Sequence, residues 1–176
     1  GRVALLARSS EGLVQDLLVP DGSVRTRVHE YGGGALAASE HRIVYSSDRD
    51  RRLYTMDLSG EGRMPLTPEG RFSWTDISLS PDDRFLFCVR EDHTREGEPA
   101  NEIVRIALDG SEIVPIVTGR DFVAAPRISP DGRNLAWIAW DHPNMPWDDS
   151  ELWQVTLDAD GHPGEPEQIM GGSNQS

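Results

Sequence analysis

Two short polar segments contain the side chains best suited to binding or chemistry. The first lies at 91–98 and contains, in order, Glu91, Asp92, His93, Glu96 and Glu98. Carboxylates gathered in one loop can hold the α-amino group of a peptide through charge-assisted hydrogen bonds, as an aminopeptidase requires. The alternative is an acidic loop that is simply solvated. Glu91 and His93 are the candidate substrate or domain contacts from this segment.

The second polar segment lies at 142–149 and contains His142, Asn144, Trp147, Asp148 and Asp149. A polar loop with an exposed tryptophan is typical of a surface that contacts a substrate or another domain. Alternatively, the segment is only a connector, which Pro143 and Pro146 stiffen by fixing their φ angles. The candidate contacts from this segment are His142, Asn144, Trp147 and Asp148.

The sequence predicts no catalytic, cofactor-binding or metal-binding residue. It contains no Gly-x-Ser-x-Gly motif, which a nucleophile elbow requires. The run at 32–34 is not followed by the lysine of a phosphate loop, and we expect these glycines to let the chain enter a crowded inner strand. Asp158–Gly161 lacks two acidic ligands of a calcium loop, and the five histidines lack zinc-site spacing.

Composition and charge exclude two classes of partner. The chain has 176 residues, with 17 Lys and Arg against 30 Asp and Glu, for a net charge of −13. Such a charge disfavours nucleic acid and anionic lipid, both of which attract basic surfaces. No apolar stretch reaches the ~18 residues that a membrane span needs. No signal peptide is visible and we expect a cytoplasmic protein, although a start at Gly1 suggests a piece of a longer chain.

An internal repeat organises the sequence. The motif Ser-Pro-Asp-Asp-Arg at 80–84 returns as Ser-Pro-Asp-Gly-Arg at 129–133, a separation of 49 residues, and each copy is followed by an apolar run. The apolar segments that begin at Ile103 and Leu152 repeat at the same separation. A third, shorter copy includes the apolar run after Arg42. Repeats of about 40–50 residues are typical of propellers.

Each repeat contains four strand-like pieces. The first ends at the Ser-Pro-Asp turn, and the second, such as 85–89, is apolar on both faces and suits a strand buried from both sides. The third, such as 103–108, alternates and predicts a half-buried strand. The fourth contains proline, as at Pro65 and Pro115, and proline marks an edge strand because it lacks an N–H group.

This pattern predicts an all-β fold, a fragment of a β-propeller made of four-stranded antiparallel blades. We place three complete blades at about 28–69, 70–119 and 120–171, and a tail at 172–176. Residues 1–27 supply three more strands, at 3–7, 13–19 and 23–28, but no innermost strand, so they predict an incomplete blade. An open arc would expose apolar blade faces, so the pattern predicts either self-association of the fragment or its place within a larger ring of blades.

Several segments resemble a known family. They are Arg25–Ala35, Arg90–His93, Asn101–Val104 and Leu135–Trp153. Together they resemble the propeller of prolyl-oligopeptidase-family serine peptidases, in particular the acylaminoacyl-peptidase and dipeptidyl-aminopeptidase branch. The Ser-Pro-Asp-Gly-Arg turn is shared with TolB-like propellers. The resemblance spans nearly the whole chain.

The resemblance implies a non-catalytic segment that gates or positions peptide substrates for a C-terminal α/β-hydrolase domain of the same parent chain. That hydrolase domain would carry the serine, aspartate and histidine of catalysis, and none of the three can be assigned here. One alternative is a TolB-like propeller that binds proteins and has no hydrolase attached. A further alternative, a propeller glycosidase or lactonase, would require carboxylates or metal ligands converging on the central channel.

Overall fold

The computed structural model describes residues 1–18, 20 and 22–172, all of it without helix. Its strands are β1 (Leu6–Arg8), β2 (Val14–Asp16), β3 (Leu36–Ala38), β4 (Ile43–Ser46), β5 (Leu53–Met56), β6 (Met64–Pro65), β7 (Phe72–Leu79), β8 (Phe85–Asp92), β9 (Ala100–Ala107), β10 (Ile113–Arg120), β11 (Phe122–Ile128), β12 (Asn134–Trp140), β13 (Glu151–Thr156) and β14 (Glu167–Gly171). No helix in these residues is long and apolar enough to cross a membrane.

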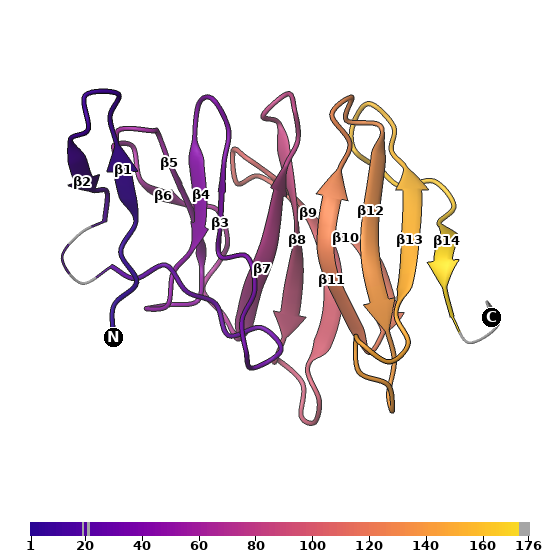
Figure 1. Ribbon diagram of the computed structural model, residues 1–176. Helices are drawn as coiled ribbons and strands as arrows, with labels where there is room; N and C mark the ends of the chain where they lie inside the picture. Colours follow the sequence, from indigo (N-terminus) through magenta and orange to yellow (C-terminus); the bar gives the residue numbers. More distant parts are fainter. Residues whose placement is uncertain (19, 21, 173–176) are drawn as a thin grey trace.

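The described strands form three four-stranded antiparallel sheets and a smaller sheet of β1 and β2 (Figure 1). The sheets run β3-β4-β5-β6, β7-β8-β9-β10 and β11-β12-β13-β14, each in simple sequence order. The first strands contact one another, since β7 touches both β3 and β11. The sheets are therefore blades that meet along their first strands, and the prediction of a propeller fragment with about three complete blades is confirmed.

The repeated Ser-Pro-Asp turn has the same hydrogen bonds in both copies. The Ser80 hydroxyl accepts a bond of 2.9 Å from the Phe85 N–H, and the Ser129 hydroxyl accepts one of 3.0 Å from the Asn134 N–H. In each turn the aspartate carboxylate accepts the N–H of the arginine two residues later. Local hydrogen bonding of this kind favours a turn over continued strand, which explains why the motif stands at the ends of the first strands β7 and β11.

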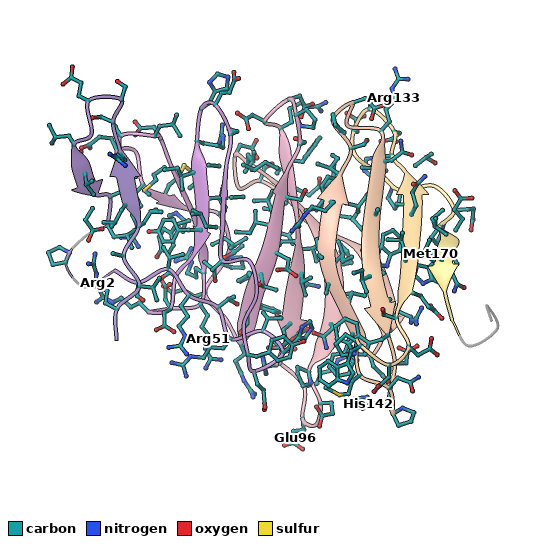
Figure 2. All side chains as sticks on the ribbon, viewed as in Figure 1. Arg2, Arg51, Glu96, Arg133, His142 and Met170 are labelled. Carbon is teal, nitrogen blue, oxygen red and sulfur yellow. The ribbon has the colours of Figure 1, made fainter. Side chains whose placement is uncertain are left out.

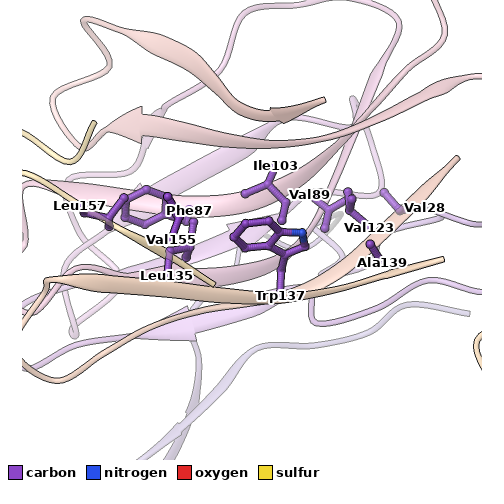
Figure 3. Packing of buried hydrophobic residues seen from close by; sticks show 10 residues of the cluster. All are labelled: Val28, Phe87, Val89, Ile103, Val123, Leu135, Trp137, Ala139, Val155 and Leu157. Carbon is purple, nitrogen blue, oxygen red and sulfur yellow. The ribbon is translucent and has the colours of Figure 1, made fainter. Parts of the chain in front are cut away.

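The hydrophobic core lies between the blades. Along β8, Phe87 and Val89 point to one neighbouring blade while Leu86 and Cys88 point to the other, so the strand is buried on both faces as predicted. Figure 3 shows the cluster between the last two complete blades, with Trp137 packed at its centre. Burial also raises the pKa of the Cys88 thiol, which makes it an inert core side chain.

The third strand of the middle blade differs from the prediction. A half-buried strand was expected, with Arg105 on a polar face, but β9 is buried on both faces and Arg105 is only 2% exposed. The reason is that the 158–161 turn of the next blade lies against this face, where the Asp160 carbonyl accepts a hydrogen bond from the guanidinium group. The inner strands of a blade with neighbours on both sides are covered on both faces, which the pattern of one strand cannot reveal.

The N-terminal segment contains fewer strands than expected. The structure has β1 and β2 there, while the third expected strand, at 23–28, forms only an isolated bridge between Val24 and Ser47 of the next blade. Val19 and residues 173–176 lie outside the described residues. Leu6 and Val14 are exposed on this small sheet, and self-association of the fragment stays a prediction, as do the blade boundaries.

The glycine run at 32–34 lies where two blades approach closely, just before the innermost strand β3. A Cβ atom on Gly33 would collide with the Thr75 hydroxyl and the Asp76 carboxylate of β7. Gly34 donates its N–H to that carboxylate at 2.7 Å. These contacts support the interpretation that the glycines let the chain enter a crowded inner strand.

Candidate functional site

A groove of about 830 Å³ lies at the end of the blades where the two polar segments emerge. Figure 2 places Glu96 and His142 together at this end, and Arg133 of a Ser-Pro-Asp turn at the opposite end. Four stretches contribute to the lining, and the residues are Arg27, His29, Glu30, Tyr31, Glu91, His93, Glu98, Pro99, Ala100, Asn101, Arg120, Asp121, Phe122, Trp140, His142, Asn144, Met145 and Pro146.

The structure brings four of the six candidate contacts into this groove and leaves two outside. Those that line it are Glu91, His93, His142 and Asn144. Trp147 lies on the surface beyond the groove, with 75% of the residue exposed. Asp148 instead supports its own loop, because its carboxylate accepts the Met145 N–H at 3.2 Å.

Glu91 is buried, and both of its carboxylate oxygens are occupied. Oε1 accepts the backbone N–H of His29 at 2.9 Å, and Oε2 lies 2.8 Å from Nε2 of His93. The first bond ties the innermost segment at 29–31 to β8, which comes 62 residues later. Glu91 therefore orders the groove by holding His29 and His93 in place.

His29 is held in one tautomer by a chain of hydrogen bonds. The Asn101 amide donates from Nδ2 to the Asp121 carbonyl at 2.8 Å, so its Oδ1 is the acceptor that lies 3.1 Å from Nε2 of His29. Nε2 must then carry the proton. Burial lowers the pKa of His29, and the nearby Glu91 carboxylate and the Asn101 bond oppose this only in part. His29 is therefore a neutral ring at neutral pH.

The lowered pKa of His29 predicts acid-sensitive stability. An unfolded histidine titrates near its ordinary value of about 6.5, so below that pH the unfolded chain binds more protons than the folded one, and stability falls. Acidic groups with lowered pKa values, such as Asp121, stay ionised in this range. We expect the melting temperature to drop between about pH 7.5 and about pH 5.5, and to drop less in His29→Gln. An equal drop in melting temperature with pH in the original protein and in His29→Gln would contradict this prediction.

Asp121 and His142 form a second pair at the rim. Oδ2 of Asp121 accepts both the backbone N–H of His142, at 2.9 Å, and its ring Nδ1, at 3.1 Å. These bonds lower the pKa of Asp121. The charge of the neighbouring Arg120 lowers this pKa as a smaller contribution, and its guanidinium group binds Asp141 at 2.9 Å and Glu151 at 2.6 Å.

Aromatic rings form one wall of the groove. Phe122 and Trp140 stack with centroids 5.1 Å apart, and His142 lies 4.9 Å from Phe122. His29 meets both stacked rings edge-on, at 5.6 and 5.7 Å, and Tyr31 extends from His29 toward solvent. Such a wall suits a planar or apolar ligand group, while the carboxylates beside it suit a cation.

The sequence analysis missed several groove residues. They are His29, Tyr31, Asn101, Asp121 and Phe122. Each is a single polar or aromatic residue in a segment whose sequence contains no binding or catalytic motif. The only signal in the sequence was that His29, Tyr31 and Asn101 lie within segments with family resemblance. Among the described residues, no group of three or more His, Cys, Asp or Glu side chains could hold a metal ion.

Comparison with known proteins adds solved structures only, since neither a family model nor a curated protein matches the sequence. Puromycin hydrolase has a TM-score of 0.89 and 31% identity, over 97% of this chain and 29% of that chain. A puromycin-hydrolyzing peptidase of Mycobacterium tuberculosis has a TM-score of 0.85 and 34% identity, over 98% of this chain and 29% of that chain. This chain is a propeller fragment similar to the propeller of prolyl-oligopeptidase-family peptidases.

TolB-like propellers share the architecture more distantly. A putative TolB from Agrobacterium tumefaciens has a TM-score of 0.64 and 20% identity, over 97% of this chain and 57% of that chain. This likeness shows the fold alone. The propeller fragment described here spans only about 29% of the length of the two puromycin-hydrolyzing proteins, so activity, substrates and partners belong to a proposal.

Proposed function

We propose that this propeller fragment is non-catalytic and positions amine-bearing peptide substrates for an α/β-hydrolase domain in the same parent chain. The observation that carries the proposal is the groove, which combines carboxylates, histidine rings and an aromatic wall at one end of the blades. By the same proposal, the ring of blades admits peptides and excludes folded proteins. The similarity to peptidases that act on puromycin supports this assignment.

The electrostatics of the groove favour a cation. Its lining carries the carboxylates of Glu30, Glu91, Glu98 and Asp121 against the guanidinium groups of Arg27 and Arg120. Arg120 is already paired with two carboxylates outside the lining, so its charge is balanced locally. A recess with more carboxylates than guanidinium groups and low-dielectric walls concentrates the opposite charge, here the ammonium group at the amino end of a peptide.

The reaction itself must be supplied by another domain. The sequence offers no Gly-x-Ser-x-Gly motif, so this proposal gives the propeller a role in binding and orientation and none in bond cleavage. Holding the amino end in a fixed place lowers the entropic cost of bringing the scissile bond to a nucleophile.

The test compares a free and a blocked amino end. We expect isothermal titration calorimetry to show that Ala-Ala-amide binds the protein. N-acetyl-Ala-Ala-amide should bind at least about tenfold more weakly, since acetylation removes the charge. No hydrolysis of either peptide by this chain alone is expected. Equal affinity for both peptides would overturn the proposed function.

Trp147 provides a separate prediction about the exposed loop. Because the side chain is largely in solvent, Trp147→Ala should change the free energy of unfolding by about 0.5 kcal/mol or less. In the protein that contains the hydrolase domain, however, we expect an altered KM for peptides, because an exposed tryptophan is typical of a contact surface. Steady-state kinetics beside thermal melts measure the two effects, and unchanged kinetics would make the loop a simple connector.

A further inference from the structure

A second cavity lies at the end of the blades opposite to the groove, where the Ser-Pro-Asp turns are (Figure 2). We propose that it binds the zwitterion of a small free α-amino acid, with Arg42 holding the carboxylate and Asp83 holding the ammonium group. The inference goes beyond the proposed function, which concerns only the groove. Neither the sequence motifs nor the similar structures assign a ligand to this end.

All three complete blades contribute to this cavity, which has a volume of about 580 Å³. Arg42 comes from the turn between β3 and β4 of the first complete blade, and Asp83 comes from the first Ser-Pro-Asp turn of the middle blade. Asp160 and His162 come from the connection between β13 and β14 of the last blade. A ligand bound here would contact elements that are far apart in the sequence.

Polar atoms without a hydrogen-bond partner gather in the lining. Among the described residues, four buried side-chain polar atoms have no partner, and three of them are Nε of Arg42, Oδ1 of Asp83 and Nε of Arg105. Arg105 is only 2% exposed. Buried polar groups are nearly always hydrogen-bonded, because an unmade bond leaves the cost of desolvation uncompensated. The lining therefore has unused donors on two guanidinium groups and an unused acceptor on one carboxylate.

Most other charged groups of the lining are already bound within the protein. The contacts join Arg84 to Asp160, Arg105 to Glu112, His162 to Asp158, and Asp109 to the Ser111 N–H of its own exposed turn. Arg42 has no ion pair among the described residues, and Asp83 has none either. One positive and one negative group are thus left, and a ligand that carries one charge of each sign matches them.

Arg42 and Asp83 lie side by side where the first and middle blades meet. The Ser39 hydroxyl accepts the Arg42 backbone N–H at 3.3 Å and donates to Oδ2 of Asp83 at 3.0 Å. An α-amino acid carries its carboxylate and ammonium groups on one carbon, so it can accept from the guanidinium group and donate to Oδ1 together. A simple anion would leave Oδ1 unpaired beside a like charge, and a simple cation would leave the guanidinium group unpaired.

The two side chains must move slightly to admit the ligand. Nε of Arg42 and Oδ1 of Asp83 are covered, although each residue as a whole is partly exposed. A rotation of the long Arg42 side chain uncovers both atoms, and the ordering of this side chain on binding limits the affinity.

Three forms of alanine test the inference by isothermal titration calorimetry. We expect L-alanine to bind. L-alaninamide, which lacks the carboxylate, and N-acetyl-L-alanine, which lacks the ammonium group, should each bind at least about tenfold more weakly. This comparison uses the unaltered protein, so it does not depend on the folding of any variant. Equal binding of L-alanine and either derivative would overturn recognition of the group that the derivative lacks.

Variants locate the site. Arg42→Gln and Asp83→Asn should each weaken L-alanine about tenfold, and asparagine tolerates the positive φ of 54° at position 83. The matched control is Glu40→Gln, which removes an exposed carboxylate from the same turn as Arg42 but outside the lining, and its affinity should stay within about twofold. An equal loss in all three variants, or no loss in any, would overturn the site.

The groove supplies an internal reference for this experiment. Ala-Ala-amide, the probe of the proposed function, should bind Arg42→Gln and Asp83→Asn as it binds the original protein, because the groove lies at the other end of the blades. Retained binding of Ala-Ala-amide without any binding of L-alanine to the original protein would overturn the zwitterion site and leave the proposed function standing.

Discussion

Replacing Arg105 with alanine is expected to lower the free energy of unfolding by about 3 kcal/mol, since the change removes charged hydrogen bonds and a cation–π contact from the interior. The guanidinium group binds the Asp160 carbonyl through NH1 and the Glu112 carboxylate through NH2. It also lies 4.5 Å above the Phe85 ring. The Asp160 bond joins two blades, so its loss loosens the packing of the 158–161 turn against β9.

Arg84 is the matched control for this prediction because its exposed side chain donates hydrogen bonds to the same turn. It donates to the Ala159 carbonyl at 3.0 Å and to the Asp160 carboxylate at 3.1 Å, and its guanidinium lies 4.8 Å from the same Phe85 ring. Its side chain is 51% exposed, so Arg84→Ala should cost about 1 kcal/mol or less. Urea unfolding measures both variants. Equal losses would mean that burial of Arg105 contributes nothing beyond the surface contact.

The architecture was predictable because local signals repeat. The Ser-Pro-Asp turn carries its own hydrogen bonds, and the apolar run after it must be buried wherever it occurs, so two copies at a fixed separation define a blade. The proline-bearing pieces likewise became the outer strands β6 and β10. By contrast, the burial of Arg105 depends on a turn 55 residues away, and no local pattern records that contact.

The groove was predictable only in part, for the same reason. The segments at 91–98 and 142–149 are polar enough to be noticed separately, and both reach the groove. Their meeting with His29 and Asp121 depends on how blades stack, as the bond from His29 to Glu91 across 62 residues shows. Trp147 was predicted as a contact because it is a tryptophan in a polar loop, and the structure places it outside the lining, in a loop where the Asp148 carboxylate accepts the Met145 N–H.

The second large effect is expected at Asp76, whose carboxylate joins the innermost segments of three blades. Oδ1 accepts the Gly34 N–H at 2.7 Å, and Oδ2 accepts the Ala125 N–H at 2.9 Å. Ala125 stands 49 residues after Asp76, so the carboxylate links positions that the repeat makes equivalent. Hydrogen bonds to a charged acceptor contribute about 1.5–3 kcal/mol each, and Asp76→Ala should therefore cost about 3 kcal/mol or more.

A backbone effect must be separated from this loss, because Asp76 has a positive φ of 55° that alanine adopts poorly. Asp83 has a φ of 54°, and among the described residues its carboxylate accepts one hydrogen bond, at 3.0 Å, from the Ser39 hydroxyl of the preceding blade. Asp83→Ala therefore carries the same strain but loses a single side-chain link between two blades instead of the three-blade bridge. We expect Asp83→Ala to cost about 1 kcal/mol. Asp76→Asn should fall between the two, since it tolerates the backbone but turns an amide donor toward one backbone N–H group. Equal midpoints of urea unfolding for the two alanine variants would show that the bridge does not hold the blades together.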